Sequence, residues 1–200
     1  MHKPPTPAER ILSAADRLFY TQGIRAVGVD AIAEEARVSK RTLYNHYPTK
    51  DDLVAAYLTA RFKHVPPSDA PAREQILGYF ERMEKLFADG GFRGCPYVNA
   101  VTELGDRKHA AARIALQFKE QRIAWYRALL ERMGVAEPQR LAMQLQLLVE
   151  GAISAVLVSN DPSVARDARA AAEVLLDAAL KSVPSTNFSG AAKLRRRSRH

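Results

Sequence analysis

The chain has 200 residues, and its 47% hydrophobic content is enough for one large folded domain or two small ones. A single cysteine excludes an internal disulfide framework and a cysteine-rich zinc site, which predicts a reducing, cytoplasmic location. The opening stretch MHKPPTPAER lacks the apolar core of a secretory signal, and no run approaches the roughly 18 uncharged residues of a membrane span. We therefore expect a soluble protein with no membrane association.

The formal net charge is +8, and the basic residues of the last eight positions supply +5 of it. The remaining positive charge is concentrated in residues 1–50, which hold eight basic and five acidic side chains. Such a balance suits an anionic partner such as nucleic acid, with a solvated basic face as the alternative.

Two helices are predicted near the start of the chain. The stretch TPAE at 6–9 has the capping-box pattern with proline at the first helical position, so a helix should begin at residue 7. Apolar residues at helical spacing carry it to about Gln22, where Gly23 supplies a left-handed stop. Residues 29–36 keep their apolar side chains on one face, and Asp30 lies in the first turn, where the helix dipole favours an acid.

Two further short helices follow. Ser39 should cap a third helix that reaches about His46, and Thr49 with Asp52 forms a second capping box that opens a fourth. The proline-rich stretch VPPSDAP at 65–71 then breaks the helical pattern. We therefore expect a compact N-terminal unit before this break.

Beyond the break, helices with apolar faces alternate with turns. Their expected ranges are 72–89, 96–105, 109–133, 138–159 and 163–182. No alternating strand pattern is present, so the predicted fold class is all-α. Residues 185–200 have too little apolar content to fold, so we expect a disordered basic tail. This tail either adds non-specific DNA affinity or only solubilises the chain.

The third helix is unusually polar. Its surrounding stretch, VSKRTLYNHYPTKDDL at 38–53, offers few aliphatic residues for a buried face. The polar and aromatic side chains that it presents are Lys40, Arg41, Thr42, Tyr44, Asn45 and His46, with Lys50 from the next helix. A helix-turn-helix DNA-binding unit consists of a short helix, a tight turn and a second short helix, held by a preceding amphipathic helix. Residues 29–47 would form this unit. The alternative is an ordinary solvated helix face.

At this point the sequence resembles the tetracycline-repressor (TetR) family. The stretch VDAIAEEARVSKRTLYNHYPTKDDL follows the family pattern of Ile-Ala, two residues, Ala-Gly-Val-Ser, then Thr-Leu-Tyr, His, an aromatic, Lys and Leu. The resemblance is specific over residues 7–60, and elsewhere it extends only to a helical array of suitable length. It implies an N-terminal three-helix helix-turn-helix DNA-binding domain plus a larger helical ligand-binding and dimerisation domain. The expected boundaries are 1–50 for the DNA-binding domain, 51–65 for a connecting helix, 66–184 for the effector and dimerisation domain and 185–200 for the tail.

The outer face of the third helix would then lie in the major groove, which admits an α-helix. Leu43 and Tyr47 would anchor its inner face. Lys40 and Arg41, beside the helix N-terminus, can meet phosphates, and Arg41 could instead make a bidentate contact to guanine. Thr42 offers a hydroxyl and a methyl group.

The resemblance implies further DNA contacts beyond the first turn of this helix. Tyr44 and His46 are expected to reach the DNA backbone or a base edge, and Asn45 could read adenine. Lys50 would hold a phosphate from the start of the fourth helix. Arg37 departs from the family pattern, because it stands where the turn has glycine and must adopt a strained φ or rearrange the turn. Gly28 stands where Ser or Thr often caps the second helix, and glycine caps acceptably.

Catalysis finds little support in the sequence. The five histidines show no metal-ligand spacing, and there is no glycine-rich phosphate loop, Walker-type lysine or serine-nucleophile elbow. We expect no catalytic residue, no metal and no cofactor. A helical adaptor protein without sequence-specific DNA binding is the alternative to a regulator.

The resemblance therefore implies a ligand-responsive transcriptional regulator, most simply a repressor, that binds double-stranded DNA. Because one recognition helix covers only a few base pairs, we expect a homodimer on a palindromic operator. The helices at 138–159 and 163–182 are the dimerisation candidates, and their alternative role is to form the core of a monomer.

A small apolar or aromatic effector is expected to bind among the helices that follow the break. The candidate lining residues, each of which could instead be plain core, are Phe80, Met83, Phe87, Tyr97, Phe118, Trp125, Tyr126, Met143 and Leu147.

Cys95 is a candidate sensor thiol. Pro96 favours a helix that begins at or just after the cysteine, so the thiol would sit at a helix N-terminus with Arg93 nearby. That environment favours the thiolate, whose oxidation or alkylation could release DNA, and some relatives of the family sense through a cysteine. The alternative is an inert, buried cysteine.

Overall fold

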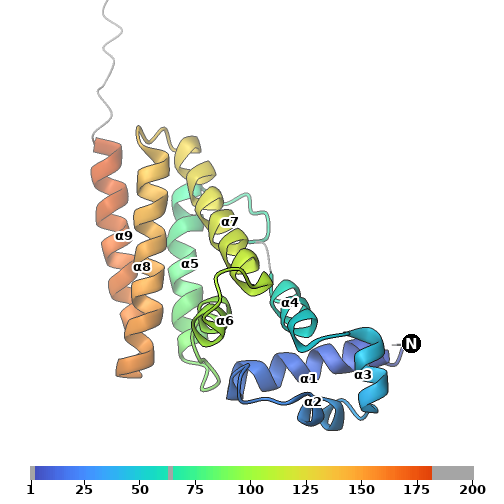
Figure 1. The fold of residues 1–200 in the computed structure, drawn as a ribbon. Coiled ribbons are helices and arrows are strands. Elements are labelled where there is room, and N and C mark those ends of the chain that lie inside the picture. Colours follow the sequence, from blue (N-terminus) through green and yellow to red (C-terminus); the bar gives the residue numbers. More distant parts are fainter. Residues whose placement is uncertain (1–2, 63–64, 182–200) are drawn as a thin grey trace, which may run out of the picture.

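The structure is a computed structural model that describes residues 3–62 and 65–181. Within these residues it contains nine α-helices and no strand, so the predicted all-α fold class is confirmed (Figure 1). The helices are α1 (Pro7–Gln22), α2 (Val29–Glu35), α3 (Lys40–His46), α4 (Lys50–Ala60), α5 (Ala72–Phe87), α6 (Pro96–Leu104), α7 (Ala110–Arg132), α8 (Pro138–Ser159) and α9 (Val164–Lys181). The connecting segment expected over 51–65 is shorter as a helix, because α4 ends at Ala60. The predicted basic tail at 185–200 lies outside the described residues.

Side-chain caps fix the ends of the helices near the N-terminus. Thr6 Oγ1 accepts a hydrogen bond from the Glu9 amide at 3.3 Å, and the Glu9 carboxylate accepts from the Thr6 amide at 2.7 Å. These hydrogen bonds from Thr6 lower the pKa of the Glu9 carboxyl. Thr49 and Asp52 form the same reciprocal pair at the start of α4, with both N–O distances at 3.0 Å. Both capping boxes predicted from the sequence are therefore confirmed.

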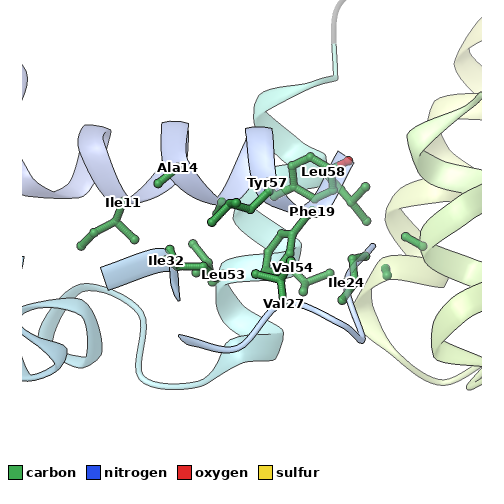
Figure 2. Close-up of a cluster of buried hydrophobic side chains, with 14 of the residues drawn as sticks. Ile11, Ala14, Phe19, Ile24, Val27, Ile32, Leu53, Val54, Tyr57 and Leu58 are labelled. Atoms are coloured by element: carbon green, nitrogen blue, oxygen red, sulfur yellow. The ribbon is translucent and has the colours of Figure 1, made fainter. Parts of the chain in front are cut away.

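Helices α1 to α4 enclose a first hydrophobic core (Figure 2). Ile11 from α1, Ile32 from α2 and Leu53 from α4 are fully buried in it. The rings of Phe19 and Tyr57 meet edge to face, with centroids 5.6 Å apart. Apolar residues at helical spacing thus fasten the short helices to α1, which is the brace that the sequence predicted.

This first core continues into α6 and the first turns of α7. Tyr97, Ala100 and Ala111 belong to the same buried cluster. The hydroxyl of Tyr97 donates a hydrogen bond to the carbonyl oxygen of Leu58 in α4, at 3.3 Å. The N-terminal helices therefore share side-chain packing with helices from beyond the proline-rich break.

Helices α5, α7, α8 and α9 enclose a second core (Figure 1). In it α9 packs against α5 and α8, and α7 packs against α8 and α5. Phe80, Tyr126, Leu130, Leu145 and Leu176 are fully buried there. Burial raises the pKa of the Tyr126 hydroxyl far above its usual value. This core holds α7 and α8 at fixed spacing around the cavity described below.

Helix α8 is long and apolar enough, by length and composition alone, to cross a membrane. In the structure it packs between α7 and α9. Leu141, Leu145 and Val149 on its inner side belong to the second core. Packing between neighbouring helices accounts for the apolar residues on this inner side.

Candidate nucleic-acid interface and effector cavity

The helix-turn-helix unit consists of α2, a turn at 36–39 and α3. The Val38 amide donates a hydrogen bond to the Ala33 carbonyl at 3.0 Å, which closes the end of α2. Arg37 adopts φ 52°, the left-handed conformation that glycine would take without strain. Ser39 then caps α3, with its hydroxyl accepting from the Thr42 amide at 3.0 Å. The turn therefore keeps its shape despite the arginine.

The inner side of α3 is fastened to the first core by two residues. Leu43 is completely buried, and Tyr47 packs against the same cluster while remaining partly exposed. Partial burial raises the pKa of the Tyr47 hydroxyl. With these anchors in place, the opposite side of the helix faces solvent.

Four of the seven residues expected to contact DNA form an exposed patch on α3. Arg41 and Asn45 lie one helical turn apart, and Tyr44, which is 44% exposed, and His46 lie beside them. Side chains four residues apart share one face of a helix. This arrangement places a guanidinium, an amide, a phenol and an imidazole where a groove of DNA could meet them.

The other three expected residues have protein partners. Thr42 is partly buried, with its hydroxyl 2.8 Å from that of Ser39. Lys40 Nζ lies 2.7 Å from Asp30 Oδ1, and this hydrogen bond raises the pKa of the Lys40 ammonium. Lys50 lies over the Phe19 ring at 6.0 Å, and burial lowers the pKa of its ammonium. Lys40 keeps an exposed charge, whereas Lys50 is held closer to the protein.

A cavity of about 670 Å³ lies where the N-terminal helices meet α5, α6, α7 and α8. Its lining residues are Leu12, Ser13, Asp16, Ala60, Arg61, Tyr79, Leu86, Phe92, Gly94, Cys95, Pro96, Tyr97, Phe118, Lys119, Arg122, Gln146, Val149, Glu150 and Ile153. The volume falls in the range of small-molecule sites. Because Asp16 belongs to α1 and Arg61 follows α4, the cavity has walls from both parts of the chain.

Only two of the expected effector-pocket residues line this cavity. Tyr97 and Phe118 form a stacked pair in its wall, with centroids 4.1 Å apart. The others lie elsewhere: Phe80, Met83, Phe87 and Tyr126 are buried in the second core, Trp125 packs against that core, and Met143 and Leu147 are exposed.

The polar residues of the cavity were not predicted from the sequence. Gln146 and Glu150 lie one turn apart on α8, and Lys119 and Arg122 come from α7. A signal was available for the first two, because a glutamine and a glutamate four residues apart interrupt an apolar run that otherwise suits a core helix. No comparable signal marks Lys119 and Arg122, since α7 carries charged residues along its whole length.

Cys95 also lines the cavity. It is the N-cap residue of α6, with Pro96 in the first turn, as the sequence predicted. Its side chain is buried, and the ammonium nitrogen of Lys119 lies 3.5 Å from Sγ. Lys119 also forms an ion pair with Glu150. The cation beside the thiol is therefore Lys119, which sequence reasoning did not identify.

Hydrogen bonds join α1 and the segment that follows it to α6 and the loop before α6. The Tyr20 hydroxyl donates to the Gly94 carbonyl at 3.1 Å and accepts from the Arg93 amide at 3.0 Å. Beyond α1, the Arg25 amide donates to Glu103 Oε2 at 3.1 Å. A displacement of the loop before α6 would thus act directly on α1.

Helix α3 has one buried face and one exposed polar face, and α1 holds it in place. This arrangement is that of a helix-turn-helix DNA-binding protein. The family model for bacterial regulatory proteins of the tetR family matches residues 11–57. A solved structure from Streptomyces avermitilis, described as a TetR transcriptional regulator, is 38% identical, with a TM-score of 0.79 over 88% of this chain and 98% of that one. A TetR-family transcriptional regulator from Streptomyces coelicolor is 30% identical, with a TM-score of 0.76 over 87% of this chain and 96% of that one. The HTH-type transcriptional regulator YjdC of Escherichia coli (strain K12) is 24% identical over 84% of this chain and 92% of its own length.

The chain belongs to the TetR family of bacterial transcriptional regulators. The predicted family is confirmed, and with it the role of a DNA-binding transcription regulator. Its relatives are regulators rather than enzymes, and the family placement favours the regulator over the adaptor alternative.

Proposed function

We propose that this chain is a ligand-responsive repressor that binds a palindromic operator as a homodimer and leaves it when a small molecule occupies the cavity. One observation carries the proposal: the cavity is walled by Asp16 of α1 and by Arg61 at the end of α4, as well as by α7 and α8. A ligand there touches the helices that position α3. We assign residues 1–50 to DNA binding, 51–65 to the connection and 66–184 to effector binding and dimerisation.

Exposed apolar side chains on α8 and α9 support the homodimer. Leu147 and Val158 on α8 are 61% and 88% exposed, and Val174 on α9 is 68% exposed. The two helices form one edge of the molecule (Figure 1). Large exposed apolar residues on adjacent helices favour pairing with a second copy, which would bury them in a four-helix bundle. Two recognition helices related by two-fold symmetry would then read two half-sites.

The route from ligand to DNA runs through α1. Arg61 Nη2 lies 2.9 Å from Asp16 Oδ2, and its guanidinium lies 4.2 Å from the centre of the Tyr20 ring. Tyr20 in turn bonds the loop before α6. A ligand that displaces either Arg61 or this loop changes the position of α1, and with it the separation of the two recognition helices in a dimer. Binding to DNA and binding to ligand then oppose each other, as linkage requires.

Phosphate and base contacts are assigned to the α3 surface and its neighbour Lys50. Arg41, Asn45 and Tyr44 are exposed for base or backbone contact. A variant that carries both Tyr44→Ala and Lys50→Ala should lose operator binding. Unchanged affinity of this variant would show that DNA lies against another surface.

The direct test of the proposed function is fluorescence anisotropy with DNA from the promoter region next to the chain's own gene. We expect salt-sensitive binding to one palindromic segment, two chains bound for each segment, and weaker binding after a cavity ligand is added. Binding of equal strength to unrelated DNA would refute operator recognition. A DNA-binding regulator of this kind is expected in the cytoplasm.

The Lys119 contact favours a second candidate function, in which Cys95 senses electrophiles or oxidants. The ammonium of Lys119 lies 3.5 Å from Sγ. Cysteines beside a cation are the ones that electrophiles and oxidants modify most readily. Alkylation of Cys95 should proceed more slowly in the Lys119→Met variant and should release DNA from the wild-type protein. Cys95→Ser should bind DNA normally and ignore the reagent. Operator affinity that survives full alkylation would leave Cys95 with a packing role.

A further inference from the structure

The charged side chains that line the cavity do not balance. Asp16 and Arg61 form one ion pair, and Lys119 and Glu150 form another. The fifth charged residue, Arg122, has no acidic partner among residues 3–62 and 65–181. The cavity wall therefore carries one uncompensated positive charge.

Arg122 lies in the cavity wall and has one donor that no protein group satisfies. Its guanidinium lies over the rings of Tyr79 and Phe118, with distances to the ring centres of 4.6 Å and 5.5 Å. Its Nη1 atom is closed off from solvent and has no hydrogen-bond partner. Aromatic faces stabilise the cation but accept no N–H hydrogen bond of ordinary strength, so the donor stays unsatisfied. A carboxylate is the group that pairs best with the planar edge of a guanidinium.

Gln146 supplies a second unsatisfied group, of opposite kind. The residue is only 5% exposed, and its Nε2 donates a hydrogen bond to Glu150. Because an ionised carboxylate can only accept, this bond fixes which end of the amide faces Glu150. Gln146 Oε1 is buried without a partner. An unpaired buried acceptor is costly, and a ligand hydroxyl that donates to it would remove that cost.

The rest of the cavity wall is largely apolar and aromatic. Phe92, Tyr97 and Phe118 contribute rings, and Val149 and Ile153 contribute aliphatic surface. Aromatic rings at a wall favour a flat ring in offset or edge contact. The cavity thus combines a surface for a ring with one unpaired cation and one unpaired acceptor.

We propose that the cavity binds an aromatic carboxylic acid that also carries a hydroxyl group. The carboxylate pairs with Arg122, the hydroxyl donates to Gln146 Oε1, and the ring packs against Phe118 and its neighbours. Both polar residues line the cavity. A cationic ligand would add to the uncompensated charge, and a neutral one would leave Arg122 unpaired. This inference rests on the proposed effector role of the same cavity.

Isothermal titration calorimetry on the full chain tests the ligand class without DNA. The probes are 4-hydroxybenzoate, 6-hydroxy-2-naphthoate and 4'-hydroxybiphenyl-4-carboxylate, each with its methyl ester and its analogue without the hydroxyl. We expect at least one acid to bind about 10- to 100-fold more tightly than its ester, the range expected for a charge-assisted hydrogen bond. Arg122→Met should abolish that preference, and Arg122→Lys should retain part of it. Removing the ligand hydroxyl should weaken binding to the wild-type chain but not to Gln146→Leu.

Three results would overturn the proposed ligand class. They are equal affinity for acid and ester, an acid preference that persists in Arg122→Met, and no binding of any acid at millimolar concentration. Thermal unfolding of each variant identifies losses that come from misfolding, and Arg122→Lys provides a folded comparison. DNA binding is measured separately. An acid that binds with the expected preference but leaves operator affinity unchanged would refute the effector role and keep the ligand class. If other compounds release DNA and no acid binds, the effector role stands and the proposed ligand class is refuted.

Discussion

Lys40 offers the most direct quantitative test of the DNA-binding surface. It lies at the first position of α3, and its ammonium is paired with Asp30 while both side chains stay more than half exposed. An exposed ion pair of this kind contributes little to stability, so Lys40→Ala should leave the fold intact. If Lys40 meets a phosphate, however, the same change removes two phosphate contacts from a dimer.

The size of the effect follows from counterion release. Each phosphate contact on duplex DNA contributes about −0.9 to the slope of log K against log salt concentration, so two lost contacts make the slope about 1.8 units less steep. Between roughly 50 and 200 mM salt, a fourfold change, this difference corresponds to about a 12-fold change in the ratio of wild-type to variant affinity. The deficit of Lys40→Ala should therefore be large at low salt and should shrink as salt is added.

The assay is operator binding by fluorescence anisotropy at four or more salt concentrations. Lys85→Ala is the matched control, because Lys85 is an exposed lysine on α5, a helix of the second core. Asp30→Asn should tighten binding slightly at low salt, since it removes a negative charge next to Lys40. An unchanged slope in Lys40→Ala, or an equal change in Lys85→Ala, would refute the assignment of Lys40 to a phosphate.

Three further predictions concern stability, assembly and coupling. Leu43→Ala empties a fully buried site and should lower the free energy of unfolding by about 2–5 kcal/mol, measured by urea denaturation, whereas the exposed Tyr44→Ala should change it by less than about 0.5 kcal/mol. Leu147→Glu should yield a monomer in sedimentation at micromolar concentration. The control Leu116→Glu, at an equally exposed apolar site on α7, should remain a dimer. If both variants remain dimers, the α8 interface is refuted. Tyr20→Phe removes two hydrogen bonds between α1 and the loop before α6, so it should cost about 1–3 kcal/mol and reduce the effect of a cavity ligand on DNA binding; an unchanged ligand response would place the coupling elsewhere.

Helix positions could be predicted from the sequence because their signals are local. A capping box such as Thr6 with Glu9 acts within four residues, and a glycine such as Gly23 ends α1 by its own backbone freedom. The orientation of the recognition helix could also be predicted from the sequence. A short helix with one apolar anchor, Leu43, can pack against a core in few ways. The strain at Arg37 was implied by the family resemblance, because the family pattern has glycine at this position of the turn.

The cavity could not be predicted in the same way, because aromatic residues at helical spacing look alike whether they line a pocket or fill a core. Phe80 and Phe118 occupy similar positions in their helical patterns, yet Phe80 is buried in the second core and Phe118 lines the cavity. The difference depends on how α5 and α7 are oriented about their axes. That orientation is set by contacts between residues distant in sequence, which single-sequence periodicity does not contain.

The same limitation applies with greater force to charge pairing. The five charged residues of the cavity come from α1, α7, α8 and the end of α4; they are Asp16, Arg61, Lys119, Arg122 and Glu150. No local sequence pattern predicts that four of them form two ion pairs and that one cation has no acidic partner among the described residues. In a fold that fixes the cavity walls, one substitution on α7 or α8 would change the leftover charge without disturbing the helices. Ligand preference can therefore diverge among chains that share this fold and this DNA-binding unit, because the fold depends on apolar spacing and the preference depends on which charged group lacks a partner.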